Sequence, residues 1–272
     1  MAYQGDLLAH LADYKRSILA IRQPGLFRYR GTNVQRDHIL PLTSADLNLF
    51  PLARDLAAAL SSSNPDIVRH RYFHHLNSSQ AFAFNLFLPF FSGSASASGA
   101  LLRQLTQTAQ LTSWELEAVP DPVEGTNLDA QWVTDDGTTT ICEVKLSEAE
   151  FGKAADDARH RDKLARIYQP VLSGCVPPAL LNAPMFFEVY QILRNVWHLA
   201  RLQNGRLVFL LPRANTNLWA TLTQVLGQVA PPTRSRIAII AIEDVLQGLA
   251  ADANCPSDMR IYAKGLSLKY VP

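Results

Sequence analysis

Two short apolar runs near the C-terminal end constrain the fold more than any other feature of the sequence. RLVFLLP occupies residues 206–212, and RIAIIAI occupies residues 236–242. Continuous apolar runs of this length are typical of strands that are buried on both faces of a sheet. The segment between them, TNLWATLTQVLGQVA at 216–230, has the pattern of a helix. We therefore expect an α/β (α+β) chain in which helices cover both faces of a sheet.

Three alternating segments upstream predict an antiparallel part of the same sheet. WELEAV at 114–119, NLDAQWV at 127–133 and TTICEVKL at 139–146 each alternate polar and apolar residues with period two. Because they follow one another closely, they favour a three-stranded meander. The fold class predicted from the whole chain is a central mixed sheet with a three-stranded antiparallel meander, flanked by helices.

The other segments give weaker patterns. The strongly apolar stretch at 78–91 predicts a helix, for which Ser78 or Ser79 is a plausible N-cap. The serine-rich SGSASASG at 92–99 reads as a flexible loop. Further expectations are helices at 6–21, 100–111, 148–169 and 183–203, and a last hairpin at 259–271.

Composition excludes several classes of protein. The 272-residue chain is 48% apolar, which is enough for a sizeable core, and its net charge of +1 argues against a nucleic-acid binder that is basic over its whole surface. Three cysteines without a CxxC pair indicate a reducing compartment. The N-terminus has no apolar core of the kind found in a signal peptide, and no run reaches the ~18 apolar residues of a membrane span. We therefore expect a cytoplasmic protein with no membrane partner.

The first 75 residues form a candidate N-terminal extension, mainly helical, ahead of a main domain at 76–272. An irregular stretch within it, broken by prolines and glycines, is locally basic and carries no acid from Lys15 to Arg36. Its arginines alternate with aromatic residues, which is a pattern suited to phosphate contacts. The DNA-binding candidates are Arg22, Arg28 and Arg30; the alternative is an ordinary solvated loop.

The register of the hairpin at 126–146 decides which polar side chains share a face. A two-residue turn at Asp136–Gly137 would place Asp129 and Glu143 on opposite faces. A three-residue loop, Asp135 to Gly137, places Asp129 directly opposite Glu143 and Asn127 opposite Lys145. The second register also leaves a wholly apolar face behind, formed by Leu128, Ala130, Trp132, Cys142, Val144 and Leu146. We therefore predict the three-residue loop, since a core requires such a face.

This register brings two carboxylates together. Across a strand pair their Cβ atoms lie about 5 Å apart, which is unfavourable unless a cation lies between them. Two carboxylates with open positions for water and phosphate suit Mg²⁺ or Mn²⁺. Lys145 points to the same side, where its ammonium group can hold a water or stabilise charge on a phosphate.

The pattern of Asp129 followed by Glu143-Val144-Lys145 resembles the PD-(D/E)XK nuclease superfamily, in its restriction-endonuclease-like bacterial branch. Three fragments strengthen the resemblance: SSQAFAFNLFLPF, EVKLSEAEFG and YQILRNVWHLA. It covers residues 70 to 215 approximately. The resemblance implies that the core is restriction-endonuclease-like, that Asp129 and Glu143 bind the metal, and that Lys145 supports the attacking water.

The sequence also departs from the superfamily pattern. Many members have a Glu on the first helix, where this chain offers Gln80; Glu124 is another candidate for a third acid. The helix after the meander often supplies a Gln or Lys, a role that Gln191 would fill, with Arg194 one turn further on. The alternative for Gln191, Arg194, His198 and Arg201 is a solvated polar stripe on one face of that helix.

The function expected from these residues is a DNA endonuclease, restriction- or repair-like, that depends on Mg²⁺ (or Mn²⁺). DNA is the expected substrate, and a homodimer is one way to cut two strands. The main alternative is an inactive member of the same fold that binds DNA or protein. A more distant alternative is an α/β protein that binds a nucleotide or small ligand at the ends of the two C-terminal strands.

Overall fold

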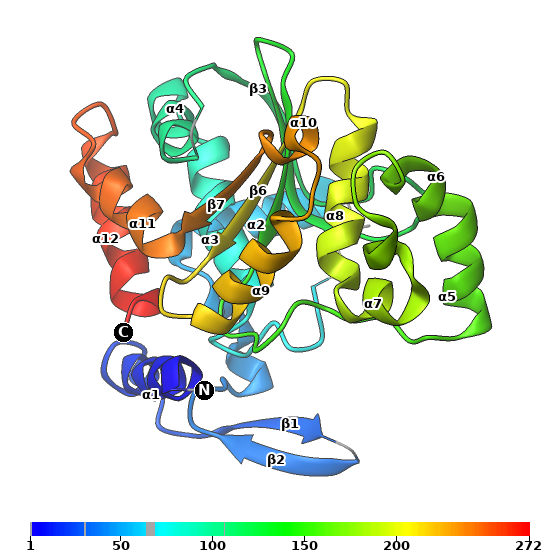
Figure 1. Cartoon of the computed structure of the whole chain (residues 1–272). Helices are drawn as coiled ribbons and strands as arrows, with labels where there is room; N and C mark the ends of the chain where they lie inside the picture. The colour runs from blue at the N-terminus through cyan, green and yellow to red at the C-terminus, as the bar shows by residue number, and fades with distance from the viewer. Residues whose placement is uncertain (1, 30, 64–68, 106) are drawn as a thin grey trace.

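The computed structural model describes residues 2–29, 31–63, 69–105 and 107–272, and its centre is one five-stranded mixed sheet (Figure 1). The strands lie in the order β3-β4-β5-β6-β7. β3, β4 and β5 are antiparallel neighbours, whereas β6 runs parallel to β5 and β7 parallel to β6. Their bounds are β3 Leu111–Ala118, β4 Leu128–Thr134, β5 Thr139–Val144, β6 Gly205–Leu211 and β7 Ile237–Ala241. The predicted meander and mixed sheet are confirmed.

The hairpin between β4 and β5 has the predicted three-residue loop. Gln131 pairs with Ile141 and Val133 pairs with Thr139, so the same register carried towards the other end sets Asp129 opposite Glu143. Gly137 closes the loop at a φ of 78°, a left-handed conformation that favours glycine. The sequence preference of the loop and the need for an apolar face therefore select the same register.

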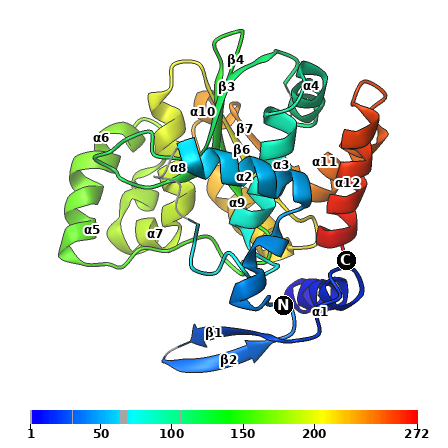
Figure 2. The same ribbon diagram turned by 180° about the vertical axis from the view of Figure 1, so that it is seen from behind.

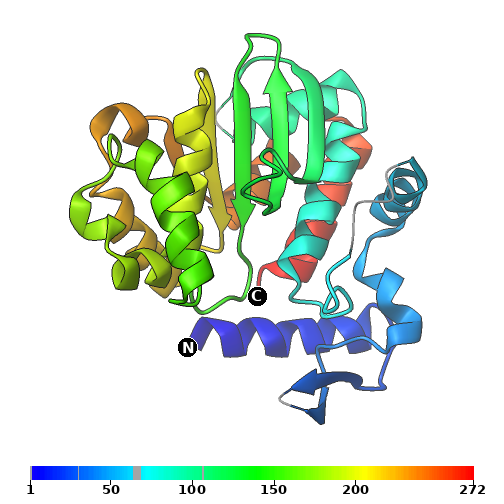
Figure 3. The same cartoon turned by 90° about the vertical axis from the view of Figure 1, so that its right-hand side faces the viewer.

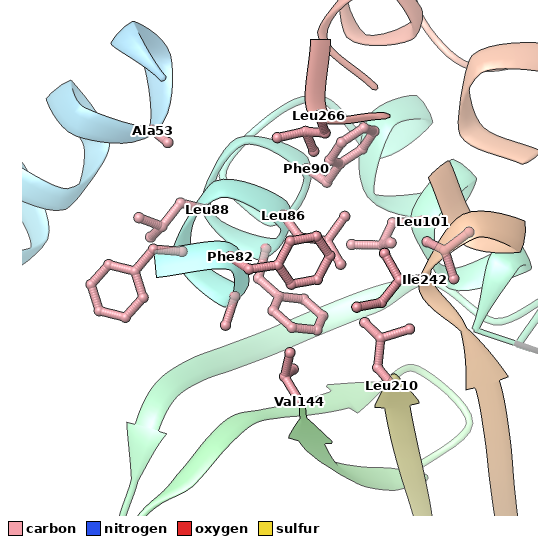
Figure 4. Close-up of a cluster of buried hydrophobic side chains, with 14 of the residues drawn as sticks. Ala53, Phe82, Leu86, Leu88, Phe90, Leu101, Val144, Leu210, Ile242 and Leu266 are labelled. Carbon is pink, nitrogen blue, oxygen red and sulfur yellow. The ribbon is translucent and has the colours of Figure 1, made fainter. Parts of the chain in front are cut away.

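Helices cover both faces of the sheet and form two cores. Figures 2 and 3 show the helices on either side of the strands. On one face, α3 (Ser79–Phe91) and α4 (Ala95–Gln104) pack with α11 (Ile242–Ala251) and α12 (Ser257–Tyr270). Figure 4 shows part of this core, where Phe82 and Leu86 of α3 lie over Val144 and Leu210 of the sheet.

The second core lies on the opposite face of the sheet, against the helices after β5. It includes Ile141, Leu207 and Phe209 from the strands. Leu128 also belongs to this second core, whereas we predicted it on the face of Ala130 and Trp132, so that assignment is wrong at the first residue of β4. The helical elements on this side are α5 Ala158–Lys163, η2 Leu164–Tyr168, α6 Gln169–Leu172, η3 Pro178–Leu181, α7 Ala183–Glu188, α8 Tyr190–Arg201, α9 Thr216–Leu226 and α10 Pro231–Arg234.

The N-terminal segment contributes to the first core. It consists of α1 (Ala2–Ser17), the strands β1 (Gly25–Tyr29) and β2 (Thr32–Arg36), the short helix η1 (Leu42–Asn48) and α2 (Pro51–Ser63). Buried leucines and alanines of α1 and α2 pack with α3 and α12. The Tyr3 hydroxyl also donates to the Leu146 carbonyl at 3.2 Å, which ties α1 to the end of the meander.

The basic stretch that we predicted to be irregular is a two-stranded ribbon. β1 pairs antiparallel with β2, from Gly25 opposite Arg36 to Tyr29 opposite Thr32. The chain reverses at Gly31, whose φ is 84°. Alternation was hidden because both faces of the ribbon are largely exposed, so the period-two signal of a half-buried strand is missing.

Two other local predictions are wrong: part of the serine-rich segment predicted as a loop is helical, and the segment predicted as a last hairpin is a helix. Helix α4 starts inside the serine-rich segment, where the Ser94 hydroxyl accepts from the Ala97 amide at 3.3 Å, and it ends at Gln104 rather than 111. The predicted last hairpin is helix α12. Its residues Met259, Ala263, Leu266 and Tyr270 recur at helical spacing and are buried.

The expected helices at 148–169 and 183–203 are shorter than predicted because backbone groups of one segment form hydrogen bonds with backbone groups of the other. The Ala154 amide donates to the Phe187 carbonyl at 3.0 Å, and the Gln191 amide donates to the Gly152 carbonyl at 3.0 Å. Residues 152–154 are therefore non-helical, and the longer helix breaks at Val189 into α7 and α8. Within the described ranges, no helix combines the length and apolar character needed to cross a bilayer.

Candidate functional site

A polar cleft of about 470 Å³ opens at the ends of β4 and β5, beside the N-terminus of α3. Residues between His70 and Gln80 line one side of it. Glu117 of β3, Asp129 of β4 and Lys145 after β5 line the other side, together with Gln191 of α8. The cleft is therefore lined by side chains from two strands, from the segment after β5 and from two helices. Two of the three predicted motif residues, Asp129 and Lys145, are among them.

Asp129 lies at the wall of the cleft and is held by the neighbouring strand. Its Oδ2 accepts a hydrogen bond of 2.7 Å from the Val144 amide. The protein packed around the carboxyl raises its pKa well above the ordinary value, and the negative charge of Glu143 raises it further. Lys145 lowers this pKa but does not outweigh the two opposing effects. In the absence of a cation, Asp129 therefore retains a proton to a pH well above the usual range.

Glu143 lies behind Asp129, with 2% of its surface exposed, and it is surrounded by donors. Its Oε1 accepts from Lys145 Nζ at 2.9 Å and Gln191 Nε2 at 2.6 Å. Burial raises the pKa of Glu143, but Lys145 and Arg194 outweigh it, so the net pKa is lowered. The opposite directions for Asp129 and Glu143 indicate that Glu143 carries the charge and Asp129 carries the proton.

Lys145 is buried, with 9% of its surface exposed, and its ammonium group keeps its charge. Burial lowers its pKa, but the carboxylates of Glu143, Glu148 and Asp129 outweigh burial and raise the pKa overall. The ammonium group therefore stays protonated at the edge of the cleft, where it can donate to a water or an anion. Asp129, Glu143 and Lys145 are brought together as the sequence predicted.

Arg194 and His198 in the polar stripe of α8 are buried, so the interpretation of the stripe as a solvated face is wrong for them, whereas Arg201 at its end is exposed. Gln191 and Arg194 contact Glu143, and Asn195 Nδ2 donates to Glu143 Oε2 at 2.9 Å. Further along the helix, His198 lies beside Glu124 and Arg201 pairs with Asp121. Every polar residue of the stripe therefore meets an acid of the strands or of the loop between β3 and β4. Asn195 was not among the predicted site residues, because a helical wheel alone does not reveal which acids lie opposite.

Glu117 is a further acid of the cleft that the sequence analysis missed. It lies between the pairs Leu116–Ala130 and Ala118–Leu128, so it is opposite Asp129 on the next strand. Its φ of 54° is a left-handed conformation, which is strained for a residue with a side chain. Burial raises its pKa, while hydrogen bonds from Gln80 and Asn127 lower it. The signal that would have found it is the meander itself, because the register of β3 on β4 extends the acidic row by one strand.

The other predicted residues have separate positions. Gln80 lines the cleft, and its Oε1 accepts from the His70 amide at 2.8 Å. Glu124 does not line the cleft: its carboxylate is buried beside Lys163, Tyr168 and Tyr190. Arg22 and Arg28 are exposed, on and beside the β1–β2 ribbon, and Arg30 lies outside the described residues. Glu124 is therefore placed as part of a buried network between the meander and α5, rather than as a third acid of the cleft.

Two other cavities are less suitable as a functional site, because one has a single charged residue in its described lining and the other is small. A cavity of about 570 Å³ between α4 and β3 has Arg103 as the charged residue of its described lining, and Arg103 is paired with Asp252 at 2.7 Å. A cavity of about 140 Å³ lies at the end of β6, where the small-ligand alternative expects a pocket. It is well below the 300–1,000 Å³ that is typical of ligand pockets. The titratable groups converge instead on the cleft at Asp129.

Comparison with known proteins gives one match. A family model described as "Restriction Endonuclease associating with ARP" matches residues 8–271, which is nearly the whole chain. No curated protein and no solved structure matches the chain. The matched range includes most of α1, the β1–β2 ribbon and the cleft.

Proposed function

The chain belongs to this family of restriction endonucleases, and from that premise we propose that it hydrolyses phosphodiester bonds of DNA with Mg²⁺ (or Mn²⁺) at a PD-(D/E)XK-type site. The observation that carries the proposal is the row of Glu117, Asp129 and Glu143 across three adjacent strands. Glu117 and Asp129 line the cleft together with Lys145, and Glu143 is buried next to Lys145. The raised pKa of Asp129, which results from burial and from the negative charge of Glu143, supports a place for a cation beside this row.

A divalent cation fits the donor chemistry of the cleft. In the described part of the chain, no group of three or more His, Cys, Asp or Glu side chains is arranged to hold a metal by itself. Mg²⁺ commonly uses one or two carboxylates and completes its shell with water and phosphate oxygens. Asp129 and Glu143 would be those two carboxylates. When bound, such an ion lowers the pKa of a water and neutralises charge on a phosphate.

The surrounding residues have distinct tasks in this proposal. Lys145 donates to the attacking water or to the phosphate oxygen on which charge develops. Glu143 is held in one orientation by four contacts, one each from Gln191, Arg194, Asn195 and Lys145. Glu117 would add negative charge next to Asp129 and so strengthen the attraction of the site for a cation. The N-terminus of α3 lies on the other side of the cleft, where the positive end of the helix dipole favours a phosphate.

The direct test is cleavage of supercoiled plasmid DNA with Mg²⁺ and with a chelator. We expect cleavage that requires the metal and falls by roughly 100- to 1,000-fold in Lys145→Met, which keeps the length of the side chain but removes its donor. Lys264→Ala is the control, because Lys264 is an exposed lysine on α12. Equal cleavage by Lys145→Met and wild type would contradict the role of Lys145. The inactive alternative instead predicts no cleavage and no heat of Mg²⁺ binding in calorimetry.

Glu117 provides a second test of the acidic row. We expect Glu117→Gln to raise the Mg²⁺ concentration needed for half-maximal cleavage by about 10- to 100-fold, as is typical when a residue beside the metal ligands is lost. Glu115→Gln is the matched control, since Glu115 lies two residues earlier on the same strand and is exposed. A Mg²⁺ titration of cleavage distinguishes the two variants. If both behave like wild type, Glu117 has no part in holding the cation.

A further inference from the structure

The β1–β2 ribbon projects from the body of the protein without a core of its own. Its strands pair with each other and with no strand of the central sheet (Figures 1 and 3). Two-stranded ribbons are marginally stable in water, so the base must supply the support. Lys15 Nζ donates to the carbonyls of Gln23 and Ile39 at 2.8 Å each, and Gly25 lies so close to Ile39 that a Cβ atom would meet it at 2.4 Å. The ribbon is therefore fixed at its base.

One face of the ribbon is joined to the wall of the cleft. Phe27 packs edge-on against Tyr72 and His75, with ring centroids 6.2 and 5.3 Å apart. Both of these partners line the cleft that contains Asp129 and Lys145. A molecule that is held in the cleft and extends past His75 will therefore meet the ribbon.

The other face carries a specific set of polar side chains. Alternation along the strands groups Leu26 and Arg28 with Asn33 and Gln35, and the register pairs Arg28 with Asn33 and Leu26 with Gln35. These residues are exposed. Among the described residues, the side chains of Arg28, Asn33 and Gln35 have no hydrogen bond or ion pair. Arginine reads guanine, and asparagine or glutamine reads adenine, through paired hydrogen bonds to base edges in the major groove.

The positive charge of the ribbon also favours DNA as the partner. Residues 25–36 contain Arg28, Arg30 and Arg36 and no acidic residue, although the whole chain is close to neutral. Each strand has five residues, which is about 17 Å of extended chain at the usual rise. The major groove of duplex DNA is about 12 Å wide and admits a two-stranded ribbon. A local positive charge, exposed amide side chains and this size match a duplex.

We propose that the face of the ribbon formed by Leu26, Arg28, Asn33 and Gln35 reads base edges in the major groove of double-stranded DNA. This proposal rests on the proposed function for its partner, and it adds the part of the chain that selects the bases, which is the exposed face of the β1–β2 ribbon. Arg28 and the two amides determine which bases are preferred, and the cleft residues cut without choosing them.

The experiment separates recognition from cleavage. The full chain is mixed, in the presence of a metal chelator, with a pool of 30-base-pair duplexes whose central positions are random, and bound duplexes are sequenced. Wild type should enrich a defined sequence. Arg28→Ala and the double variant Asn33→Ala with Gln35→Ala should each lose preference at one or more positions, with at least about fivefold weaker binding to the enriched duplex. Lys264→Ala removes a positive charge far from the ribbon and should enrich the wild-type sequence.

Four outcomes decide the matter. Altered enrichment in the ribbon variants, with melting temperatures equal to that of wild type, supports the proposal. Unchanged enrichment in both variants overturns it, as does failure of wild type to enrich any sequence. Tighter binding of wild type to a single strand of the enriched sequence than to the duplex also overturns it. None of these results depends on cleavage, so loss of Mg²⁺-dependent plasmid cutting would contradict the proposed function alone.

Discussion

Asp129→Asn is expected to reduce Mg²⁺-dependent cleavage of DNA by about 1,000-fold or more, because the several kcal/mol that a bound cation contributes would be lost with one of its two carboxylates. The same change should stabilise the metal-free fold. The asparagine side chain can still accept the hydrogen bond from the Val144 amide, and it removes a carboxyl that lies beside the ionised Glu143. A gain in stability coupled to a loss of activity is typical of a functional site.

The pH dependence of this stabilisation follows from the raised pKa of Asp129. Burial and the charge of Glu143 place the folded-state pKa above the unfolded value. Between the two values the folded state binds more protons than the unfolded state, so the wild type loses stability as the pH rises through the folded-state pKa. The advantage of Asp129→Asn should therefore be smallest in acid and grow with pH. Thermal denaturation from pH 5 to pH 9 measures it, and an advantage that shrinks with rising pH would contradict the assignment of the proton to Asp129.

Added Mg²⁺ provides an internal control for the same variant. A ligand that binds only the folded state raises the melting temperature, so the wild type should gain stability with Mg²⁺ and Asp129→Asn should not. If both proteins gain equally, the ion binds somewhere other than the pair formed by Asp129 and Glu143.

Glu143→Ala is expected to lower the free energy of unfolding by about 3–5 kcal/mol, the largest effect on stability among the site residues. Removing one partner of a buried ion pair leaves the other charge without compensation. Here the loss would leave Lys145 and Arg194 without their carboxylate, and Asn195 without its acceptor. Urea denaturation at neutral pH measures the change.

Two further variants serve as comparisons for Glu143→Ala. Glu143→Gln keeps an oxygen acceptor in the same place and should cost less stability than Glu143→Ala, although it should lose cleavage as well. Glu188→Ala removes an acid whose side chain is 59% exposed and whose partner is Lys153, so we expect a change below about 1 kcal/mol. Similar small losses for Glu143→Ala and Glu188→Ala would show that the contacts of Glu143 contribute little to the fold.

The hairpin at 126–146 shows how far local sequence reaches. Its register follows from a loop that ends in glycine and from the apolar face that alternation leaves behind, and both are properties of neighbouring residues. That is why Asp129, Glu143 and Lys145 could be assigned to one place. The wrong predictions arose where the structure depends on residues distant along the chain, or where the sequence pattern of an element is weak. The break of the long helix at Val189 depends on residues 152–154, and the β1–β2 ribbon has no buried face to mark its strands.

Sequence alone determined the meander, the two strands that are buried on both faces, and the acidic pair with its lysine, because each is encoded in periodicity or in a turn. Only the tertiary structure decided which other side chains join them. Glu117 enters the row through the pairing of β3 with β4, and Asn195 reaches Glu143 because α8 packs on that face. Glu124 is taken out of the cleft by Lys163 and Tyr168. These partners are distant along the chain, and the packing of whole elements, rather than any local preference, brings them into contact.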